Sequence, residues 1–558
     1  MNVFNKYIDV ITSDIIECLK LEYYLNIEER MIKSKIVKPN NYENGDLSIH
    51  MGFLSKEISI SPQIIAKNIG ERLMKLKKKY TINIINTYIN FTLENNDIVD
   101  IITMINDCNF CDKIYLGMPQ TIMIEFSQPN THKIFHVGHV RNLALGNSLV
   151  KFYQQLGHDV IATNYYGDEG IHIARCLWSI LKKKIIINKI TDSKERNNIL
   201  AECYIDGVKN GDKASYEINE ILKKLENNDH EIMKIWKETR KWSLDDFKNI
   251  YKWFDCEFNK EYFEHDVGQP SIKLVKDLFK DGKLDKSNET LGKDLSDYGL
   301  GYCMLLKSNG SGLYATKDIL LAMKKFEDYK LDKSLYIVDS SQSLHFQQIF
   351  KTLELLDFKH HNKCNHIPYN QVMTPEGRMK SREGNVVSFC ELAKLLEKYP
   401  IEISNSIIKY GMLKKSINKN IIFDLPDWSS VTGDTGPYIM YAFARIKGIL
   451  SKCTINDKPD WTLINKIERN IIMMMYEFWP VIHKVIENND PSYMCEFLFN
   501  LAKHFNIWYE DKENNIINCD NKCAQTNKLL LITSVSKILG KGLELLGIMT
   551  LDKIDKIV

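Results

Sequence analysis

The sequence lacks any uninterrupted run of about 18 apolar residues, the length that a membrane-spanning helix needs. Its first residues, MNVFNKYIDVITSD, carry acidic groups early and lack a small-residue cleavage site, so no secretory signal peptide is predicted. Hydrophobic residues make up 44% and charged residues 26%, which is an ordinary globular composition. We therefore expect a cytoplasmic protein that spans no membrane.

Signals for disulfides and for metal sites are scarce. The 13 cysteines are an odd number scattered along the chain, which indicates free thiols in a reducing compartment. Cys108 and Cys111 form one CxxC pair, and Cys519 and Cys523 form one CxxxC pair. Neither pair has a second pair or a histidine nearby, so we predict no structural metal.

A charge excess is also missing, because 74 Lys and Arg residues balance 72 Asp and Glu residues for a net charge of +2. This value neither indicates nor excludes a nucleic-acid partner, because local clusters of basic groups decide that question. Such clusters occur at KLKKK (75–79) and KKK (182–184). Each is explained more simply as a solvated helix face.

The 558 residues are too many for one compact core, so two to four domains are expected. Residues 1–112 combine helical periodicity at 4–25 with strand-like alternation at 88–93, which predicts a small α+β module. Residues 401–558 are nearly all helix-like, which predicts a helical bundle.

Residues 113–400 have the pattern of an α/β domain. TIMIEF (121–126), the helical pattern at 140–157 and DVIATNYYG (159–167) follow one another, with Gly157 placed to end the helix. Such a βαβ unit implies a parallel sheet with a right-handed crossover, hence a Rossmann-like catalytic domain. The charged helical pattern at about 180–250 predicts an insertion, and strand signals return at LYIVDSS (335–341).

The turn between the first strand and its helix contains HVGH, with His136, Gly138 and His139. Backbone N–H groups and the helix dipole favour an anion there, and Gly138 permits close approach to the backbone. For an isolated HxGH, a pair of satisfied helix histidines is the favoured explanation. Downstream, EGRMKSREGNVVS (376–388) offers a basic loop that can close on a triphosphate. Taken alone, that segment is an ordinary charged surface loop.

In combination these segments resemble a class I aminoacyl-tRNA synthetase. More specifically, four blocks are similar to arginyl-tRNA synthetases: EFSQPNTHKIFHVGHVRN (125–142), SGLYATKDI (311–319), SLYIVDSSQSLHFQQIF (334–350) and TGDTGPYIMYAFARI (432–446). NGDLSIHMGF (44–53) and INFTL (89–93) are similar to the N-terminal module of that family, a module of the tRNA-binding type. These blocks follow the family order over nearly the whole chain.

The resemblance implies an arginine–tRNA ligase that uses ATP with Mg²⁺ to form arginyl-adenylate. The arginyl group then passes to the 3′-terminal adenosine of tRNA(Arg), and a monomer is expected. The implied ATP-binding residues are His136, Gly138, His139, Met379 and Lys380. The implied catalytic residues are His136, His139, Lys133, Lys380, Ser381 and Arg382. The loop lacks the full K-M-S-K-S pattern, and Lys133 is the candidate that replaces the missing charge.

For arginine itself, the resemblance implies a guanidinium held between Tyr314 and Asp318, which are one helical turn apart. Glu261 aligns loosely with a further acid of the family. The other implied arginine-binding residues are Glu125, Gln128, Asn130, His139 and Gln342. Gln128 stands where serine is usual, and Glu169 stands where tryptophan is common. In the C-terminal region, the implied tRNA-binding residues are Thr432, Tyr438, Tyr441, Phe443 and Arg445, although at least half of these aromatic residues are expected to be packing residues.

Two alternative hypotheses accompany this one. Another class I specificity, or a shorter HxGH nucleotidyltransferase, would share the turn but not the Tyr314 and Asp318 pair. A synthetase-like tRNA-binding protein without catalysis would have lost the histidines or the substrate carboxylate, and this sequence retains both.

Overall fold

The computed structural model describes residues 2–39, 44–76, 80–107, 110, 118–374, 377–378, 387–455 and 457–554. The chain forms two compact units, each built from segments that are distant in sequence. Unit 1 consists of Met1–Cys111, Ala442–Pro480 and Asn500–Gly540, and unit 2 of Asp112–Tyr441, Val481–Phe499 and Lys541–Val558. The three domains expected from the sequence, 1–112, 113–400 and 401–558, stay a prediction.

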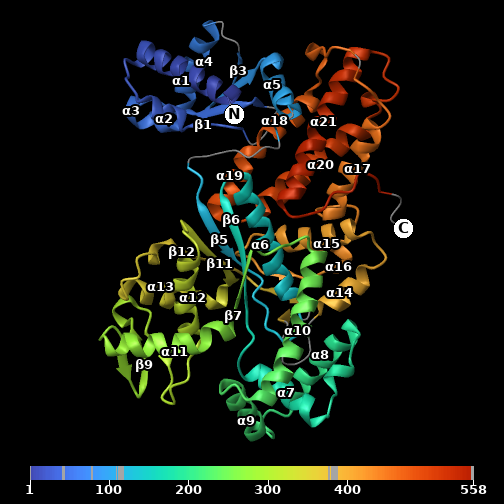
Figure 1. Cartoon of the computed structure of the whole chain (residues 1–558). Helices are drawn as coiled ribbons and strands as arrows, with labels where there is room; N and C mark the ends of the chain where they lie inside the picture. Colours follow the sequence, from blue (N-terminus) through green and yellow to red (C-terminus); the bar gives the residue numbers. More distant parts are fainter. Residues whose placement is uncertain are drawn as a thin grey trace. The chain divides into compact units, whose positions relative to one another are not determined.

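Unit 2 is built around a five-stranded parallel sheet with strand order β12-β11-β5-β6-β7 (Figure 1). Its strands are β5 (Thr121–Glu125), β6 (Asp159–Tyr166), β7 (Lys260–Phe263), β11 (Lys333–Asp339) and β12 (Cys364–Tyr369). The central strand β5 is buried on both faces, as its continuous run of apolar residues requires. The predicted parallel sheet is confirmed.

Helix α6 (Val137–Gln155) packs on the sheet and against α15 (Ile401–Leu413), so most of its residues are buried on every side. The chain leaves the helix through Gly157, whose φ of 81° lies in the left-handed region that favours glycine. Helix α12 (Tyr314–Asp328) contributes Leu321 to a cluster with Met123 of β5 and Tyr262 of β7. The carboxyl ends of the strands therefore meet the N-terminal ends of these helices, where ligands bind in open parallel sheets.

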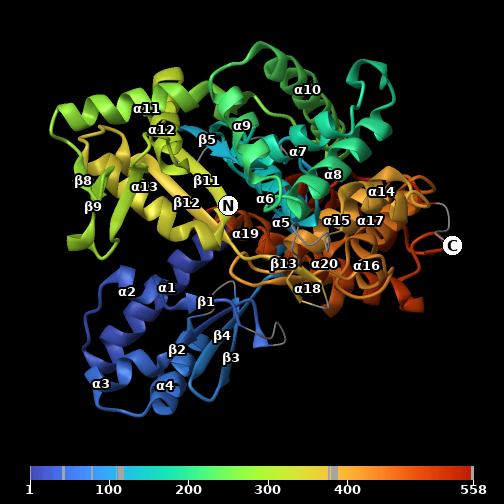
Figure 2. The ribbon, with the colours of Figure 1, turned by 90° about the horizontal axis from the view of Figure 1, so that it is seen from below.

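Between β6 and β7 the chain forms a group of helices with an apolar core of its own (Figure 2). They are α7 (Ile171–Lys182), η3 (Ile187–Lys189), α8 (Ser193–Lys209), α9 (Ser215–Glu226) and α10 (His230–Trp253). Leu177, Cys203 and Trp236 lie in that core. Trp236 and other residues of α10 also reach the loops at the end of the sheet.

The remaining elements of unit 2 surround the sheet. A second, antiparallel sheet has the order β10-β9-β8, and a small third sheet the order β14-β13-β15. The strands are β8 (Asp285–Ser287), β9 (Thr290–Asp294), β10 (Tyr302–Leu306), β13 (Val372–Thr374), β14 (Gly377–Arg378) and β15 (Ile421–Ile422). The helices are α11 (Glu264–Lys280), η4 (Ser296–Tyr298), η5 (Ser340–Gln342), α13 (Ser343–Leu355), η6 (His361–Lys363), α14 (Phe389–Leu396) and α16 (Leu425–Trp428).

Unit 1 contains an antiparallel sheet of order β1-β2-β4-β3. The predicted strand at 88–93 is β4 (Tyr88–Leu93), in which Ile89, Phe91 and Leu93 are buried. The other strands are β1 (Ile36–Val37), β2 (Leu47–His50) and β3 (Tyr80–Ile85). Its N-terminal helices are α1 (Asn2–Tyr23), α2 (Glu29–Lys33), η2 (Met51–Leu54), α3 (Ser55–Ile58), α4 (Pro62–Lys75) and α5 (Asn95–Asn106).

The C-terminal part is helical. Its elements are α17 (Gly436–Leu450), η8 (Trp461–Leu463), α18 (Lys466–Tyr476), α19 (Phe478–Asn488), α20 (Ser492–Glu510), η9 (Lys512–Asn514) and α21 (Lys522–Leu545). Within unit 1, α18 packs against α5, and Arg469 forms an ion pair with the buried Asp46. No helix in the described part of the chain is long and apolar enough to cross a membrane.

Gly146 gives a direct test of the packing of α6. A Cβ at Gly146 would lie 2.1 Å from Cγ of the buried Phe126, so Gly146→Ala must displace that ring. We expect a loss of about 1–3 kcal/mol in the free energy of unfolding. Gly448→Ala, in α17 with no atom within 4 Å of its Cβ position, is the control and should stabilise by about 0.5–1 kcal/mol. Equal shifts in the unfolding midpoints of the two variants would contradict this packing.

Candidate active site

The HVGH turn folds so that both histidines accept backbone hydrogen bonds. His136 precedes α6, and its Nδ1 accepts the N–H of Gly138 at 3.1 Å. His139 Nδ1 accepts the N–H of His136 at 3.3 Å, and the two ring centroids are 4.0 Å apart. A neutral imidazole whose Nδ1 accepts must carry its proton on Nε2. Each ring therefore presents an Nε2–H donor.

Burial keeps these rings neutral. Burial and the neighbouring charge of Lys133 lower the pKa of His136 to about 4. The pKa of His139 is lowered well below 6.5 by burial, by His136 and by Lys133. At neutral pH the turn thus offers hydrogen-bond donors, and the nearby positive charge comes from Lys133. Lys133 Nζ lies 5.7 Å from the ring centroid of Tyr204.

The segment that follows the basic loop lies directly against this turn. Val137 N–H donates to the carbonyl of Val387 at 3.1 Å, and Phe389 N–H donates to that of Phe135 at 2.8 Å. His136 and Ser388 pair in an antiparallel bridge between these two bonds. The predicted loop residues Met379, Lys380, Ser381 and Arg382 lie outside the described residues.

The end of β5 and the loop after it carry three of the predicted substrate residues: Glu125, Gln128 and Asn130. Glu125 forms a buried ion pair with Lys325 at 2.5 Å and accepts a hydrogen bond from Gln128 Nε2 at 2.9 Å. Gln128 has a positive φ of 46°, which bends the chain sharply out of the strand. Glu125 is thus already paired inside the protein.

Asn130 is held against the loop after β6. It pairs with Gly167 in a parallel bridge, and a Cβ at Gly167 would lie 2.2 Å from Asn130 Oδ1. Only glycine leaves room for the amide at this position. Gln342 is exposed in η5, just after the neighbouring strand β11. Asn130 and Gln342 therefore both lie where adjacent strands end.

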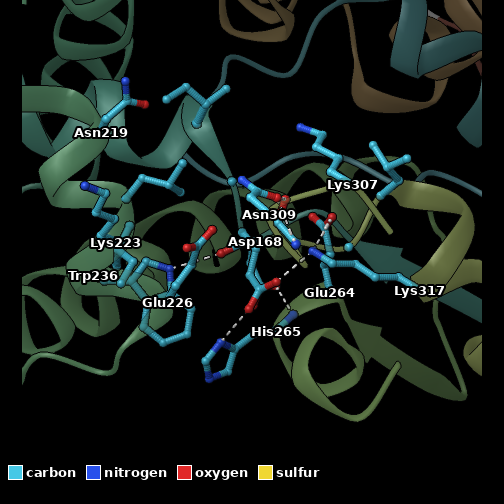
Figure 3. A pocket seen from close by; sticks show the side chains of 18 of the residues that line it. Asp168, Asn219, Lys223, Glu226, Trp236, Glu264, His265, Lys307, Asn309 and Lys317 are labelled. Carbon is cyan, nitrogen blue, oxygen red and sulfur yellow. Dashed lines mark hydrogen bonds and ion pairs between the residues drawn. The ribbon is translucent and has the colours of Figure 1, made fainter. Parts of the chain in front are cut away.

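A cavity of about 680 Å³ opens beside the carboxyl ends of β6 and β7 (Figure 3). Tyr314, the first residue of α12, lines it together with charged side chains from several elements: Asp168, Glu169, Glu264, His265 and Lys317. Asp318 lies one turn after Tyr314, and its carboxylate accepts a hydrogen bond from His345 Nε2 at 2.7 Å.

Several carboxylates converge on one phenol in this region. Burial raises the pKa of Tyr165, and the carboxylates of four acids raise it further: Asp318, Glu264, Glu125 and Asp168. Glu264 is itself buried, and burial raises its pKa to about 7 although Lys317 acts to lower it. A concentration of acids of this kind suits a cationic ligand that accepts no hydrogen bonds, such as a guanidinium.

Glu261 does not join this group. It pairs in register with Asn164, whereas the next pair, Tyr165 and Tyr262, faces α12. Neighbouring residues of a strand point to opposite faces, so Glu261 lies on the face away from α12, where it accepts a hydrogen bond from Tyr166. Glu264, three residues later, lies in the cavity instead. The family resemblance pointed to Glu261 and not to Glu264, which directly follows β7 as the first residue of α11.

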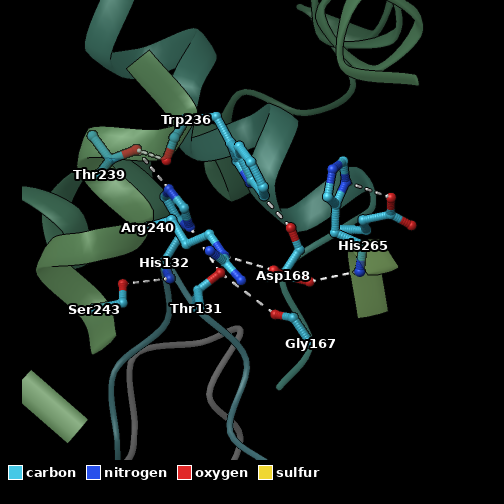
Figure 4. Close-up of polar contacts among 10 residues, drawn as sticks. Thr131, His132, Gly167, Asp168, Trp236, Thr239, Arg240, Ser243 and His265 are labelled. Atoms are coloured by element: carbon cyan, nitrogen blue, oxygen red, sulfur yellow. Dashed lines mark hydrogen bonds and ion pairs between the residues drawn. The ribbon is translucent and has the colours of Figure 1, made fainter. Parts of the chain in front are cut away.

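A polar cluster ties α10 to the two substrate loops (Figure 4). Arg240 Nε donates to the buried carboxylate of Asp168 at 2.6 Å, and Trp236 Nε1 donates to the carbonyl of Asp168 at 3.1 Å. Two other residues of α10 bind His132, which lies in the loop after β5. Thr239 bonds to His132 Nε2 at 2.8 Å, and Ser243 accepts the N–H of His132 at 2.9 Å. Burial lowers the pKa of His132 to about 3, so this histidine is neutral and structural.

Comparison with known proteins assigns this arrangement to a family. The family model for class I (R) tRNA synthetases, catalytic domain, matches residues 103–411, and the DALR anticodon binding domain model matches residues 439–554. Arginine–tRNA ligase from Bdellovibrio bacteriovorus is 35% identical over 548 residues, covering 92% of this chain and 93% of that protein. The chain belongs to the arginyl-tRNA synthetase family.

Solved structures have the same fold as this family member. Thermus thermophilus arginyl-tRNA synthetase gives a TM-score of 0.77 at 21% identity, covering 98% of this chain and 99% of that one. The Plasmodium falciparum arginyl-tRNA synthetase gives a TM-score of 0.74 at 20% identity, covering 98% of both chains. The expected class I catalytic domain and helical anticodon-binding domain are thereby confirmed, as is the membership that the sequence motifs indicated.

The residues that the synthetase resemblance implied for tRNA binding differ in exposure. Thr432 is exposed, and Tyr438 and Tyr441 are half-buried. Phe443 is buried in the helical core, so its ring is packed away from any base. Arg445 is exposed, where it donates to Asn506 at 2.7 Å and lies 5.2 Å from the ring centroid of Tyr509. Phe443 is thus one of the packing aromatics expected in this segment.

Among the described residues, no group of three or more His, Cys, Asp or Glu side chains is placed to hold a metal ion. Eleven cysteines of that part are free thiols. Cys519 and Cys523 are among them, whereas Cys108 and Cys111 lie outside the described residues.

The Nε2–H donors of this synthetase can be tested by matched substitutions. Glutamine places its amide nitrogen near the position of Nε2, whereas asparagine reproduces only the Nδ1 position and preserves the backbone cap. We expect His136→Asn and His139→Asn to slow adenylate formation by roughly 10²–10³-fold, the cost of one transition-state donor. The matching Gln variants should retain more activity in single-turnover assays. Equal rates for the Asn and Gln variants would exclude the Nε2 donor role.

Proposed function

We propose that this member of the arginyl-tRNA synthetase family is an active arginine–tRNA ligase with MgATP as co-substrate. The carboxylate of L-arginine attacks the α-phosphorus of ATP and pyrophosphate leaves. A ribose hydroxyl of the 3′-terminal adenosine of tRNA(Arg) then attacks the carbonyl of the adenylate, takes the arginyl group and releases AMP. The observation that carries this proposal is the carboxylate-lined cavity at the carboxyl ends of the parallel strands, the same end of the sheet at which the HVGH turn follows β5.

The turn would bind the phosphates. His136 and His139 donate from Nε2 to phosphate oxygens, and the backbone at Gly138 and the dipole of α6 favour the same anion. Lys133 supplies positive charge from the side of the insertion. Met379, Ser381 and the basic residues Lys380 and Arg382 would contribute to ATP binding, because the segment that follows them in sequence pairs with His136 through Ser388.

The acids would hold the guanidinium. Asp318 accepts two of its N–H groups, Glu264 accepts further ones, and the Tyr314 ring covers its flat face. Glu264 takes the place that the sequence analysis gave to Glu261. Asn130 and Gln342, with Gln128 and His139 nearby, hold the α-amino and carboxylate groups. Glu125 fixes this loop through Lys325 and Gln128.

The remaining expectations belong to the same proposal. The helical C-terminal region reads the anticodon loop of tRNA(Arg), with Thr432, Tyr438, Tyr441 and Arg445 as the accessible contact residues. The enzyme acts as a monomer in the cytoplasm. Neither adenylate formation nor the transfer to tRNA requires a resident metal, because the Mg²⁺ enters with ATP.

Arginine-dependent exchange of pyrophosphate into ATP, measured with and without tRNA(Arg), tests the activity. Asp318→Asn should raise the arginine KM at least tenfold, because an amide cannot accept two charged N–H bonds and a lost buried charge partner costs about 2–5 kcal/mol. The KM for ATP should stay within a factor of about two. Glu327→Gln, an exposed acid later in the same helix, is the control. An unchanged arginine KM in Asp318→Asn would remove Asp318 from the site.

The arginine KM should also depend on pH through Glu264. Because its pKa is raised to about 7, Glu264 becomes protonated as the pH falls through 7 and then attracts the guanidinium less strongly. We expect the arginine KM to rise between pH 8 and pH 6, by up to about tenfold per pH unit below the pKa. Glu264→Gln should raise the KM at every pH and flatten the profile. A profile that keeps its slope in that variant would assign the titration to another group.

A further inference from the structure

Two carboxylates share one ammonium group in the arginine cavity. Lys317 Nζ lies 2.7 Å from Glu169 Oε2 and 2.9 Å from Glu264 Oε1. Lys317 projects from α12 between Tyr314 and Asp318, and its side chain is only 15% exposed. Figure 3 shows the ammonium of Lys317 beside Glu264. The ammonium of Lys317 is therefore already paired with Glu264, the carboxylate that the substrate guanidinium is proposed to contact.

This arrangement creates a competition. Glu264 cannot give its full charge to an incoming guanidinium while it also holds Lys317, and two cations at one buried carboxylate would repel each other. An ammonium that loses Glu264 without another partner would be an unpaired, largely buried charge, which is costly. Arginine binding therefore needs a second acceptor for Lys317 within reach of the first.

Glu169 meets this requirement. Its carboxylate is fixed by a hydrogen bond from His265 Nδ1 at 3.1 Å, in addition to the contact with Lys317. It lies against α11, where a Cβ at Gly268 would be 2.7 Å from Glu169 Oε2, so the glycine provides the space that the carboxylate occupies.

We propose that Glu169 is a positioning residue for arginine selection, which retains Lys317 when Glu264 turns its carboxylate to the substrate guanidinium. This inference rests on the proposed function and names a residue of the same site. Lys317 moves between two partners that are already in contact with it, so its charge stays paired throughout. On arginine binding, Glu264 then exchanges one cationic partner for another, and no buried charge is left unpaired.

The protonation preferences of the two acids agree with this direction of transfer. Although burial acts to raise the pKa of Glu169, the bonds from His265 and Lys317 lower it below its usual value. Burial raises the pKa of Glu264 to about 7 despite Lys317. Glu169 is therefore the more firmly ionised partner at neutral pH. Asp168 and Arg240, two further charged groups near Glu169, pair with each other.

A mutant cycle on the full-length enzyme tests the proposal. Glu169→Gln should raise the arginine KM about tenfold, with kcat for pyrophosphate exchange and the KM for ATP changed less than about twofold. In the Lys317→Met background, Glu169→Gln should leave the arginine KM nearly unchanged, because the competing cation is gone, and Lys317→Met alone should lower the arginine KM. Calorimetric titration with arginine should give the same order of affinities. Glu226→Gln, an exposed acid of α9 that lines the same cavity, is the control and should not raise the KM.

An unchanged arginine KM in Glu169→Gln, or a double variant whose KM is the product of the single effects, overturns the proposal. If Glu169→Gln does not fold, Glu169→Asp provides the same test, because its shorter side chain lengthens the contact with Lys317. Lys317→Met should again reverse the rise in the arginine KM. Absence of arginine-dependent exchange in the unmodified enzyme would instead refute the proposed function, so the two failures are distinguishable.

Discussion

The carboxylate of Asp168 joins three segments of the chain on which the geometry of the arginine site depends. It is fully buried, and it accepts Arg240 Nε of α10 at 2.6 Å and the N–H of His265 at the start of α11 at 2.9 Å. A buried charge that loses its partner costs about 3–5 kcal/mol, so these segments keep one relative position. Gly167 precedes Asp168 and fixes Asn130, while Glu169 follows it and contacts Lys317.

The insertion between β6 and β7 is consequently part of the site. One helix, α10, supplies four side chains that bond to the loops after β5 and β6: Trp236, Thr239, Arg240 and Ser243. Those loops have few regular backbone bonds of their own, and His132 holds a positive φ of 61°. Side chains of α10 supply the partners that such buried polar groups require.

In the described structure the acids of the proposed arginine site already have partners within the protein. Asp318 is bonded to His345, Glu264 and Glu169 share Lys317, and Glu125 holds Lys325. Under the proposed function, guanidinium binding is an exchange of partners within a dense set of charges. A neutral competitor could displace these cations only by leaving carboxylates unpaired, which is a physical basis for selectivity toward a cationic side chain.

Local patterns were sufficient to predict several elements before any contact was known. The alternation at 88–93 is β4, and the sequence from TIMIEF to DVIATNYYG is the unit β5, α6 and β6, with Gly157 in the left-handed conformation after the helix. These features follow from side-chain periodicity and from the backbone freedom of glycine, which act within a few residues. His136 and His139 at the turn belong to the same class of prediction.

Only the tertiary structure decided which acids meet. The choice of Glu264 over Glu261 depends on how β7 aligns with β6, a register set by pairing between segments about a hundred residues apart. The partners Lys317 and His345, and the burial of Phe443, likewise depend on elements that are distant in sequence. Periodicity tells which residues share a face of one element, whereas the charges that face each other across a cavity are set by packing among several elements.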